Sequence, residues 1–274
     1  MRTIISLLVP CVVAAALCVF PVHLFAGEIN LLLTHNLEGR FSLQEKGQDE
    51  SDPLLVLAQN IIAERRAGKA ELYLDLGNAF YPGTLSKYSF GSVMMDYFNY
   101  LGCDATLVSS RDLRIGIDNL EFLRKGRKTR LLSTGITRGK QRYFSPYFVY
   151  AKNTASVAII GIPSRKIRFD IAEQNLYDVG LLKDASELGK VHSELERTGV
   201  RHVIALSGLA IRDTMALMAE HPWISIAVCG GDYTGEFFTG RAGRVDLADG
   251  RSIVILSEKS GYYRLDLSIE AGIS

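Results

Sequence analysis

The sequence predicts an α/β protein in which parallel strands alternate with helices and a tail of antiparallel strands makes the sheet mixed. Apolar runs of strand length alternate with segments of helical periodicity from Ile29 to Val108. The same alternation returns from Ala185 to Val228, whereas the tail from Arg244 to Ile269 carries alternating runs that are split by short turns. These three observations favour one mixed α/β domain.

Size and composition agree with that interpretation. The chain has 274 residues, of which 47% are hydrophobic and 22% are charged, so it can bury a large core within a single domain. No internal repeat, low-complexity segment or linker divides it. Lys and Arg number 31 against 30 Asp and Glu, so no global field favours nucleic acid, and we expect a small anion or a protein as partner.

The first 26 residues differ from the rest of the chain. Arg2 supplies a positive start, an apolar run extends from Ile4 to Phe20, and the small residue Ala26 precedes Gly27. This pattern predicts a secretory signal peptide over residues 1–26 and a mature domain over residues 27–274, outside the cytoplasm. The alternative is an uncleaved membrane anchor, because the apolar segment is long enough to span a bilayer.

The first half of the mature chain contains four expected strands and three expected helices. The first helix has the clearest boundaries, since Ser51 and Asp52 offer N-cap oxygens, Pro53 suits the first turn and Gly68 can close the end. Gly102 similarly closes the second helix. In chain order the elements are a strand at 29–34, a helix from 53 to 67, a strand at 72–76, a helix at 89–101, a strand at 105–108, a helix at 117–123 and a strand at 129–132.

The second half begins with an expected hairpin and then repeats the alternation. Residues 147–150 and 156–162 are apolar runs around Asn153, which predicts a turn there. A helix at 185–197, a strand at 202–206, a helix at 211–220 and a strand at 224–228 follow. In the tail, Asp249 with Gly250 and Ser260 with Gly261 predict two antiparallel hairpins.

Two cysteines lie in the predicted mature part, and export would permit them to pair. Cys103 precedes the strand at 105–108, whereas Cys229 follows the strand at 224–228. In parallel strands these positions are at opposite edges of the sheet, and even a five-residue strand covers roughly 16 Å. A disulfide tolerates a Cα separation of only about 7 Å, so we expect two buried free thiols.

The loops after the parallel strands carry a family resemblance. In chain order they read Leu31-Leu-Leu-Thr-His-Asn-Leu-Glu-Gly-Arg-Phe41, Leu74-Asp-Leu-Gly-Asn78, Gly102-Cys-Asp-Ala105 with Ser109-Ser-Arg-Asp112, Ala158-Ile-Ile-Gly-Ile162, Leu206-Ser-Gly-Leu209 and Cys229-Gly-Gly-Asp232. This series resembles the calcineurin-like metallophosphoesterase domain of secreted 5'-nucleotidases. The resemblance covers essentially the whole mature chain and implies an αββα sandwich with mixed sheets.

The same resemblance implies a degenerate metal site. The family holds two divalent metals with carboxylates, imidazoles and one amide, and a bridging hydroxide attacks phosphorus. Where the family's motifs place these ligands, this chain has Asn36, Glu38, Asn78, Ser110, Arg111, Gly208, Asp232 and Thr234. An amide, a hydroxyl or a glycine cannot replace the anionic and imidazole ligands, and Arg111 adds a permanent positive charge. The resemblance therefore predicts no catalytic site and no metal cofactor.

Several interpretations of these loops stay open at the level of sequence. His35, Glu38, Asp112 and Asp232 would form a shifted site for one weakly bound divalent cation if they converge. Arg111 would either bind an anion with the backbone amides of Gly230 and Gly231, or pair with Asp232 or Glu38 in the space that metals would fill.

A nucleophilic arrangement is a further, weaker alternative. Ser109 or Ser110 would act as the nucleophile with His35 as base and Asp75 as orienting group, but Asp75 lies inside a strand and the nucleophile-elbow spacing is missing.

The function expected from these observations is that of an exported, 5'-nucleotidase-like protein that has lost its dinuclear site. It would act as a non-catalytic binding or scaffold protein, with the membrane as a partner only if the N-terminal segment is uncleaved. The alternative is a phosphoester hydrolase with a rearranged or single-metal site. Convergence of His35, Glu38, Asp112 and Asp232 would distinguish the two.

Overall fold

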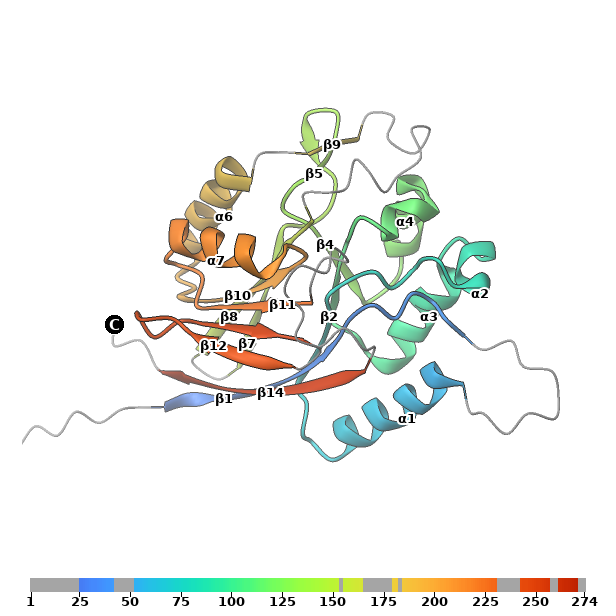
Figure 1. Ribbon diagram of the computed structural model, residues 1–274, viewed down its shortest axis with the longest axis horizontal. Coiled ribbons are helices and arrows are strands. Elements are labelled where there is room, and N and C mark those ends of the chain that lie inside the picture. Colours follow the sequence, from blue (N-terminus) through green and yellow to red (C-terminus); the bar gives the residue numbers. More distant parts are fainter. Residues whose placement is uncertain are drawn as a thin grey trace, which may run out of the picture.

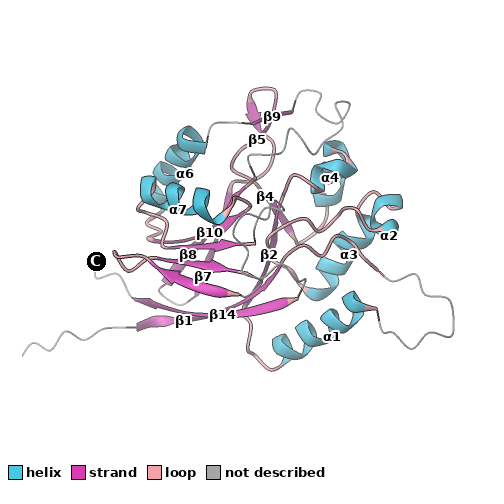
Figure 2. Cartoon of the chain, in the orientation of Figure 1, coloured by secondary structure: helices cyan, strands magenta, loops and turns pink. Residues whose placement is uncertain are grey.

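Two sheets pack face to face and helices cover both outer faces, as seen in a computed structural model (Figure 1). The structure describes residues 25–41, 52–152, 155–164, 179–181, 184–230, 242–256 and 261–270. Figure 2 shows the helices on either side of the paired strands. The architecture confirms the predicted α/β class and the αββα sandwich with mixed sheets.

The first sheet has the strand order β14-β1-β2-β3-β4. Strands β1 to β4 are parallel, and β14 joins the edge antiparallel to β1. Its elements are β1 (Phe25–Thr34), β2 (Leu72–Asp75), β3 (Ala105–Leu107), β4 (Arg130–Leu132) and β14 (Tyr262–Glu270), with the helices α1 (Pro53–Arg66), α2 (Thr84–Tyr88), α3 (Ser92–Leu101) and α4 (Ile117–Arg124) and the 3-10 helix η1 (Asp112–Ile115) between them.

The second sheet has the order β12-β13-β11-β10-β8-β7. Its four central strands are parallel, and β7 and β12 run antiparallel at the two edges. The elements are β7 (Tyr147–Lys152), β8 (Ala155–Ile162), β10 (His202–Ser207), β11 (Ile226–Cys229), β12 (Gly243–Asp246) and β13 (Ser252–Ile255), with the helices α6 (Asp184–Thr198) and α7 (Ile211–Glu220).

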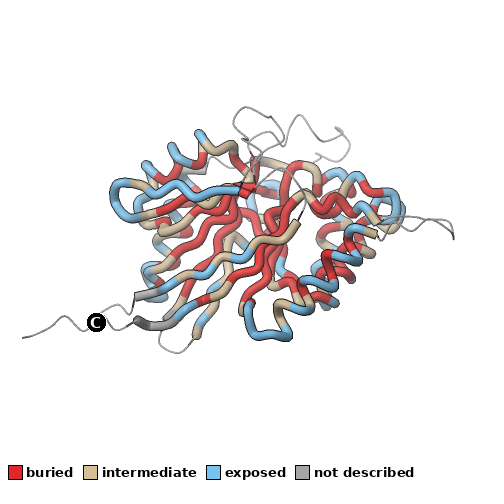
Figure 3. The backbone as a smooth tube through the Cα atoms, turned by 60° about the horizontal axis from the view of Figure 1, so that its bottom comes forward, coloured by how far each residue is buried: buried red, intermediate tan, exposed pale blue. Residues whose placement is uncertain are grey.

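Three apolar layers hold the sandwich together. Inward-facing residues of both sheets, such as Leu33, Leu74 and Leu206, form the central layer. Phe80 and Phe98 belong to the layer between the first sheet and its helices, and a third layer lies between the second sheet and α6 and α7. Figure 3 shows buried residues along the central strands and exposed residues on the outer helices. Strands covered on both faces explain why their sequences are continuous apolar runs.

The start of α1 follows the expected chemistry. The Asp52 carboxylate accepts hydrogen bonds from the backbone N–H groups of Leu54 (2.8 Å) and Leu55 (3.3 Å), and Pro53 occupies the first turn. Ser51, the other N-cap candidate, lies outside the described residues.

The helix expected at 89–101 is wrong in its first turn. The chain forms α2 first, and Phe90 and Gly91, with φ of 50° and 85°, separate it from α3. Residues in the left-handed region cannot continue an α-helix, so the helix restarts at Ser92.

The tail departs from prediction in its second half. Strands β12 and β13 form the first predicted hairpin around Gly250, whose φ is 85°. The second predicted hairpin is wrong, because β14 leaves the second sheet and pairs with β1 along nine residue pairs. Leu265 and Leu267 of β14 pack against the central layer from the first sheet. A further sheet of β5 (Ile136–Arg138), β6 (Gln141–Arg142) and β9 (Val179–Leu181) was not predicted, since runs of two or three residues show no periodicity.

Cys103 and Cys229 are buried free thiols, as predicted. Burial raises the pKa of the Cys103 thiol well above its ordinary value. The predicted signal peptide lies almost entirely outside the described residues, which start at Phe25 in β1. Among the helices that the structure describes, none is both long and apolar enough to cross a membrane.

Candidate functional site

The candidate site lies where the carboxyl ends of both sets of parallel strands meet. Strands β1, β2 and β3 end at neighbouring positions of the first sheet, and the ends of β10 and β11 face them from the second sheet. A Cβ atom at Gly208 would lie 3.3 Å from Cδ2 of Leu107, and one at Gly230 would lie 3.5 Å from Cβ of His35. Loops at such an edge are where α/β folds place their ligands.

Backbone hydrogen bonds join the loops after β1 and β2. The N–H of Asn36 donates to the carbonyl of Gly77 (3.0 Å), and the N–H of Glu38 donates to the carbonyl of Asn78 (2.8 Å). Asn36, Glu38 and Asn78 all adopt left-handed backbone conformations, with φ of 52°, 54° and 55°. Such conformations cost free energy for residues other than glycine, and they cluster at functional sites. The loops after β1 and β2 therefore hold three non-glycine residues in strained backbone conformations.

One close approach fixes the shape of the first loop. The N–H of Gly83 donates to the carbonyl of Glu38 (2.6 Å), and a Cβ at Gly83 would lie 1.9 Å from the carbonyl oxygen of Gly39. Only glycine permits this contact. Glu38 is consequently held at a defined position at the base of the loops.

The Glu38 carboxylate is buried and binds two guanidinium groups. Only 2% of its side chain is exposed, and it forms ion pairs with Arg111 through one oxygen and with Arg40 through the other. The Arg111 side chain is 26% exposed and that of Arg40 is 67% exposed, so the first pair is the more shielded from solvent. The pairing of Arg111 with Glu38 is one of the two roles expected for this arginine. Arg40 as a second partner was not predicted.

Amide groups occupy the position next to this ion pair. Nδ2 of Asn78 donates to Oδ1 of Asn36 at 2.8 Å, and the Ser109 hydroxyl lies 2.5 Å from Oδ1 of Asn78. Both amides are therefore engaged with neutral polar groups. A carboxylate at position 78 would face the Oδ1 acceptor of Asn36 where the amide now donates.

The side chain of Asp112 joins the loops that follow β2 and β3. Its buried carboxylate accepts from the backbone N–H groups of Asn78 (2.9 Å), Ala79 (2.8 Å), Phe80 (3.0 Å) and Ser109 (2.9 Å), and the Ser109 hydroxyl lies 2.7 Å from it. Burial raises the pKa of Asp112 above its usual range, and these hydrogen bonds oppose the rise. The carboxylate expected at a cation site thus organises backbone instead.

Asp75 is a second buried carboxylate with a structural set of partners. It accepts from the hydroxyls of Thr34 and Thr106, each at 2.7 Å, and from the N–H of Gly77 at 2.8 Å. Burial raises its pKa to about 7, although these donors lower it. With Ser109 directed at Asp112 and Asn78, the nucleophilic arrangement considered from the sequence gains no support from these contacts.

The remaining candidate residues divide into buried positions and undescribed ones. His35 is buried, and its ring centroid lies 5.9 Å from that of Tyr263. Ser110 is also buried, and Gly208 is closed in, because an added Cβ would lie 3.0 Å from the backbone nitrogen of Ser164. Gly231, Asp232 and Thr234 fall outside the described residues, so their expected roles stay predictions.

The described donors do not fit the two-metal centre that the resemblance implies. A dinuclear site needs several anionic or imidazole ligands that converge on each ion. Within the described part of the chain, no three His, Cys, Asp or Glu side chains come together to hold a metal. Among the ligand positions that the structure describes, Glu38 is the one carboxylate, and it is paired with two guanidinium groups; the amides of Asn36 and Asn78 bind each other.

Comparison with known proteins identifies the fold. No protein-family model and no curated protein matches the sequence. Among solved structures, the chain is similar to the NAD nucleotidase NadN of Haemophilus influenzae, with 18% identity and a TM-score of 0.66 over 88% of this chain and 48% of that one. It is also similar to the calcineurin-like phosphoesterase YfkN of Bacillus subtilis, with 16% identity and a TM-score of 0.69 over 88% and 84%.

A putative 5'-nucleotidase of Staphylococcus aureus gives 12% identity and a TM-score of 0.73, over 88% of this chain and 51% of that one. The chain spans about half the length of two of these three proteins, NadN and the Staphylococcus aureus protein. At these identities the likeness shows the fold alone, which is a metallophosphoesterase-like fold.

Proposed function

We propose that this chain is an exported, non-catalytic binding or scaffold protein built on the fold of the 5'-nucleotidases. The observation that supports it most is the placement of the Arg111 guanidinium on the buried carboxylate of Glu38. By the resemblance of the loops, both residues stand at positions where metal ligands are expected. The positive charge of the Arg111 side chain thus compensates the Glu38 carboxylate, as a bound metal ion would.

Charge explains why this pairing opposes metal binding. A guanidinium stays protonated at any accessible pH, and its charge repels a dication by several kcal/mol in a partly buried pocket. Glu38 cannot coordinate a metal without giving up its arginine partners. Two-metal hydrolysis also requires a bridging nucleophile and a clamp on the leaving oxygen, and neutral amides at Asn36 and Asn78 supply neither.

The ligand expected at this edge is a small anion, with a protein partner as the alternative occupant. About a quarter of the Arg111 side chain remains exposed while Glu38 holds it from inside. A guanidinium held in this way has a fixed orientation, and its positive charge suits a phosphate, sulfate or carboxylate group. Export follows from the composition of residues 1–26 and is part of the same proposal.

An activity assay tests the proposal. Purified mature protein is incubated with nucleotides and with a phosphodiester in the presence of manganese, zinc, cobalt or magnesium, beside an active protein of the same fold. We expect no turnover above that of the buffer with any metal. Metal-stimulated turnover that Glu38→Gln abolishes, with the fold of the variant retained, would contradict the proposal and establish a hydrolase with a rearranged or single-metal site.

A further inference from the structure

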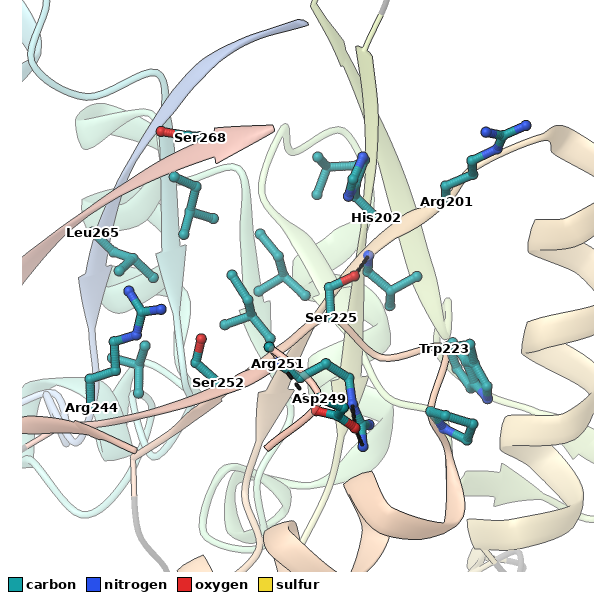
Figure 4. A pocket seen from close by; sticks show the side chains of 18 of the residues that line it. Arg201, His202, Trp223, Ser225, Arg244, Asp249, Arg251, Ser252, Leu265 and Ser268 are labelled. Carbon is teal, nitrogen blue, oxygen red and sulfur yellow. Dashed lines mark hydrogen bonds and ion pairs between the residues drawn. The ribbon is translucent and has the colours of Figure 1, made fainter. Parts of the chain in front are cut away.

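A cavity of about 580 Å³, seen from close by in Figure 4, is lined by residues of both sheets and lies apart from the candidate site. It is lined by the amino ends of β10, β11 and β13, whereas the candidate site lies at the carboxyl ends of the same strands. Its volume is within the range of about 300 to 1,000 Å³ that is usual for small-molecule sites. No step of the proposed function uses it.

The floor of this cavity is aliphatic and continues the central apolar layer. The side chains come from both sheets, so the cavity is an opening into the space between them; they are Val157, Ile204, Ile226, Val254, Leu265 and Leu267. Four of them, Ile226, Val254, Leu265 and Leu267, are only partly buried. Because these side chains are in contact with water, an apolar ligand that covers them would gain favourable binding free energy.

One wall of the cavity is the edge of β14. Four consecutive residues, Leu265 to Ser268, line it. Successive side chains of a strand point to opposite faces, so a lining that includes all four shows that the cavity follows the edge of the strand rather than one face. Within the described residues β14 pairs only with β1, which leaves this edge accessible.

Arginine residues dominate the charges around the rim. The cavity is lined by Arg201, Arg244 and Arg251 against Asp249 and Asp266. Asp249 is bound by Arg251 at 2.6 Å, and Asp266 is bound by Arg264 at 3.3 Å, so an arginine neutralises each carboxylate. Arg201 is exposed, and no carboxylate among the described residues pairs with it. Arg244 is paired with Asp246 at 2.6 Å, so the positive charge in excess at the rim is that of Arg201, whose side chain points outward from the aliphatic floor in Figure 4.

We infer that this cavity binds a single-chain amphipathic anion, such as an acyl carboxylate, with its apolar chain between the sheets and its charged head at Arg201. The apolar part covers the half-buried aliphatic side chains, and the head makes charge-assisted hydrogen bonds with the guanidinium. The ligand is a free monomeric amphiphile, since the floor lies between two sheets and is reached only by a chain that enters the opening.

The chain carries its own reporter for this test. Trp223 is the single tryptophan of the sequence, and it lines the cavity while stacking on His192, with ring centroids 4.8 Å apart. Its fluorescence should respond when a ligand fills the cavity. Calorimetric titration gives an independent measure of the same binding.

The experiment titrates the full mature protein with decanoate, decanol and decyltrimethylammonium, all below their micelle concentrations, and with phosphatidylglycerol vesicles. We expect saturable binding of decanoate at one site per chain, weaker binding of decanol and none of the cation. Decanoate that fails to bind, or that binds no better than the cation, would overturn the inference. Binding of the vesicles without binding of monomeric decanoate would also overturn it in favour of a membrane surface.

Two variants test where the head and the chain of the ligand bind. Arg201→Glu should lower the affinity for decanoate by about fivefold or more and leave the affinity for decanol unchanged, because only the contact with the charged head is lost. Leu265→Gln should weaken both ligands. Arg212→Glu, an exposed arginine on α7 outside the cavity lining, is the matched control and should change neither. Arg201→Glu is on the surface and should fold normally, so an unchanged decanoate affinity in that variant would contradict the placement of the head.

Discussion

Replacement of Arg111 by alanine should destabilise the protein strongly, because it leaves the Glu38 carboxylate buried without its main partner. Glu38 is 2% exposed, and its other partner, Arg40, is 67% exposed and therefore well screened by water. Removal of one member of a fully buried ion pair costs about 3 to 5 kcal/mol. Because Arg111 itself is 26% exposed and Arg40 remains, we expect a smaller loss of about 2 to 4 kcal/mol.

Equilibrium unfolding in urea measures this loss, and thermal unfolding should show a fall in Tm of roughly 5 to 15 °C. Arg40→Ala is the matched control, since it removes the exposed partner of the same carboxylate and should cost about 1 kcal/mol or less. The double variant Arg111→Ala with Glu38→Gln should recover much of the loss, because no charge is then left buried.

The pattern across the three variants decides the question. A free energy of unfolding for Arg111→Ala within about 0.5 kcal/mol of the wild type would refute the reasoning, as would equal losses for Arg111→Ala and Arg40→Ala. If stability is unchanged but added phosphate or sulfate no longer raises the Tm of the variant, Arg111 serves an anion instead of the carboxylate.

Three further predictions follow from the described contacts and from the N-terminal sequence. Asn78→Asp should destabilise the fold by about 1 to 3 kcal/mol at neutral pH, because a carboxylate oxygen would face Oδ1 of Asn36 in place of the amide donor; urea unfolding should show a smaller loss in acid. The pKa of Asp75 is raised to about 7 by burial, so the folded protein keeps a proton that the unfolded chain releases near pH 4. Stability should therefore fall as pH rises from about 4 to 7, and Asp75→Asn should flatten this dependence in urea titrations at several pH values. Finally, mass spectrometry of exported protein should find Gly27 as the first residue, and an intact Met1 on cytosolic protein would contradict the signal peptide.

The sequence predicted most of the layered fold because strands buried on both faces are continuous apolar runs. It did not predict that β14 would pair with β1, since its alternation suits either sheet and the choice depends on which edge lacks a partner. It also did not predict the interruption between α2 and α3 at Phe90 and Gly91. Both residues have left-handed backbone conformations, and of the two only the glycine is a local sequence signal for such a conformation.

The sequence predicted which loops form the candidate site, but it did not predict most of the contacts between their side chains. The loops that carry Asn36, Glu38 and Asn78 lie together as the order of parallel strands requires. Asp112 was expected as a ligand, yet it binds backbone N–H groups whose directions depend on the conformation of the facing loop. Ser109 and Asp112 are three residues apart, and the Asp112 carboxylate accepts from the backbone N–H of Ser109; this Ser-x-x-Asp spacing, which resembles that of a capping box, was the available signal for the role.

The metal content of the purified protein tests the central claim most directly. Mature protein is purified without chelators, incubated with manganese and zinc, freed of unbound ions by gel filtration and measured by elemental analysis against protein concentration. We expect well under one transition-metal ion per chain, because Arg111 and Arg40 hold the Glu38 carboxylate and the neighbouring ligand positions are amides. Two tightly bound metal ions per chain, lost on Glu38→Gln, would contradict the account.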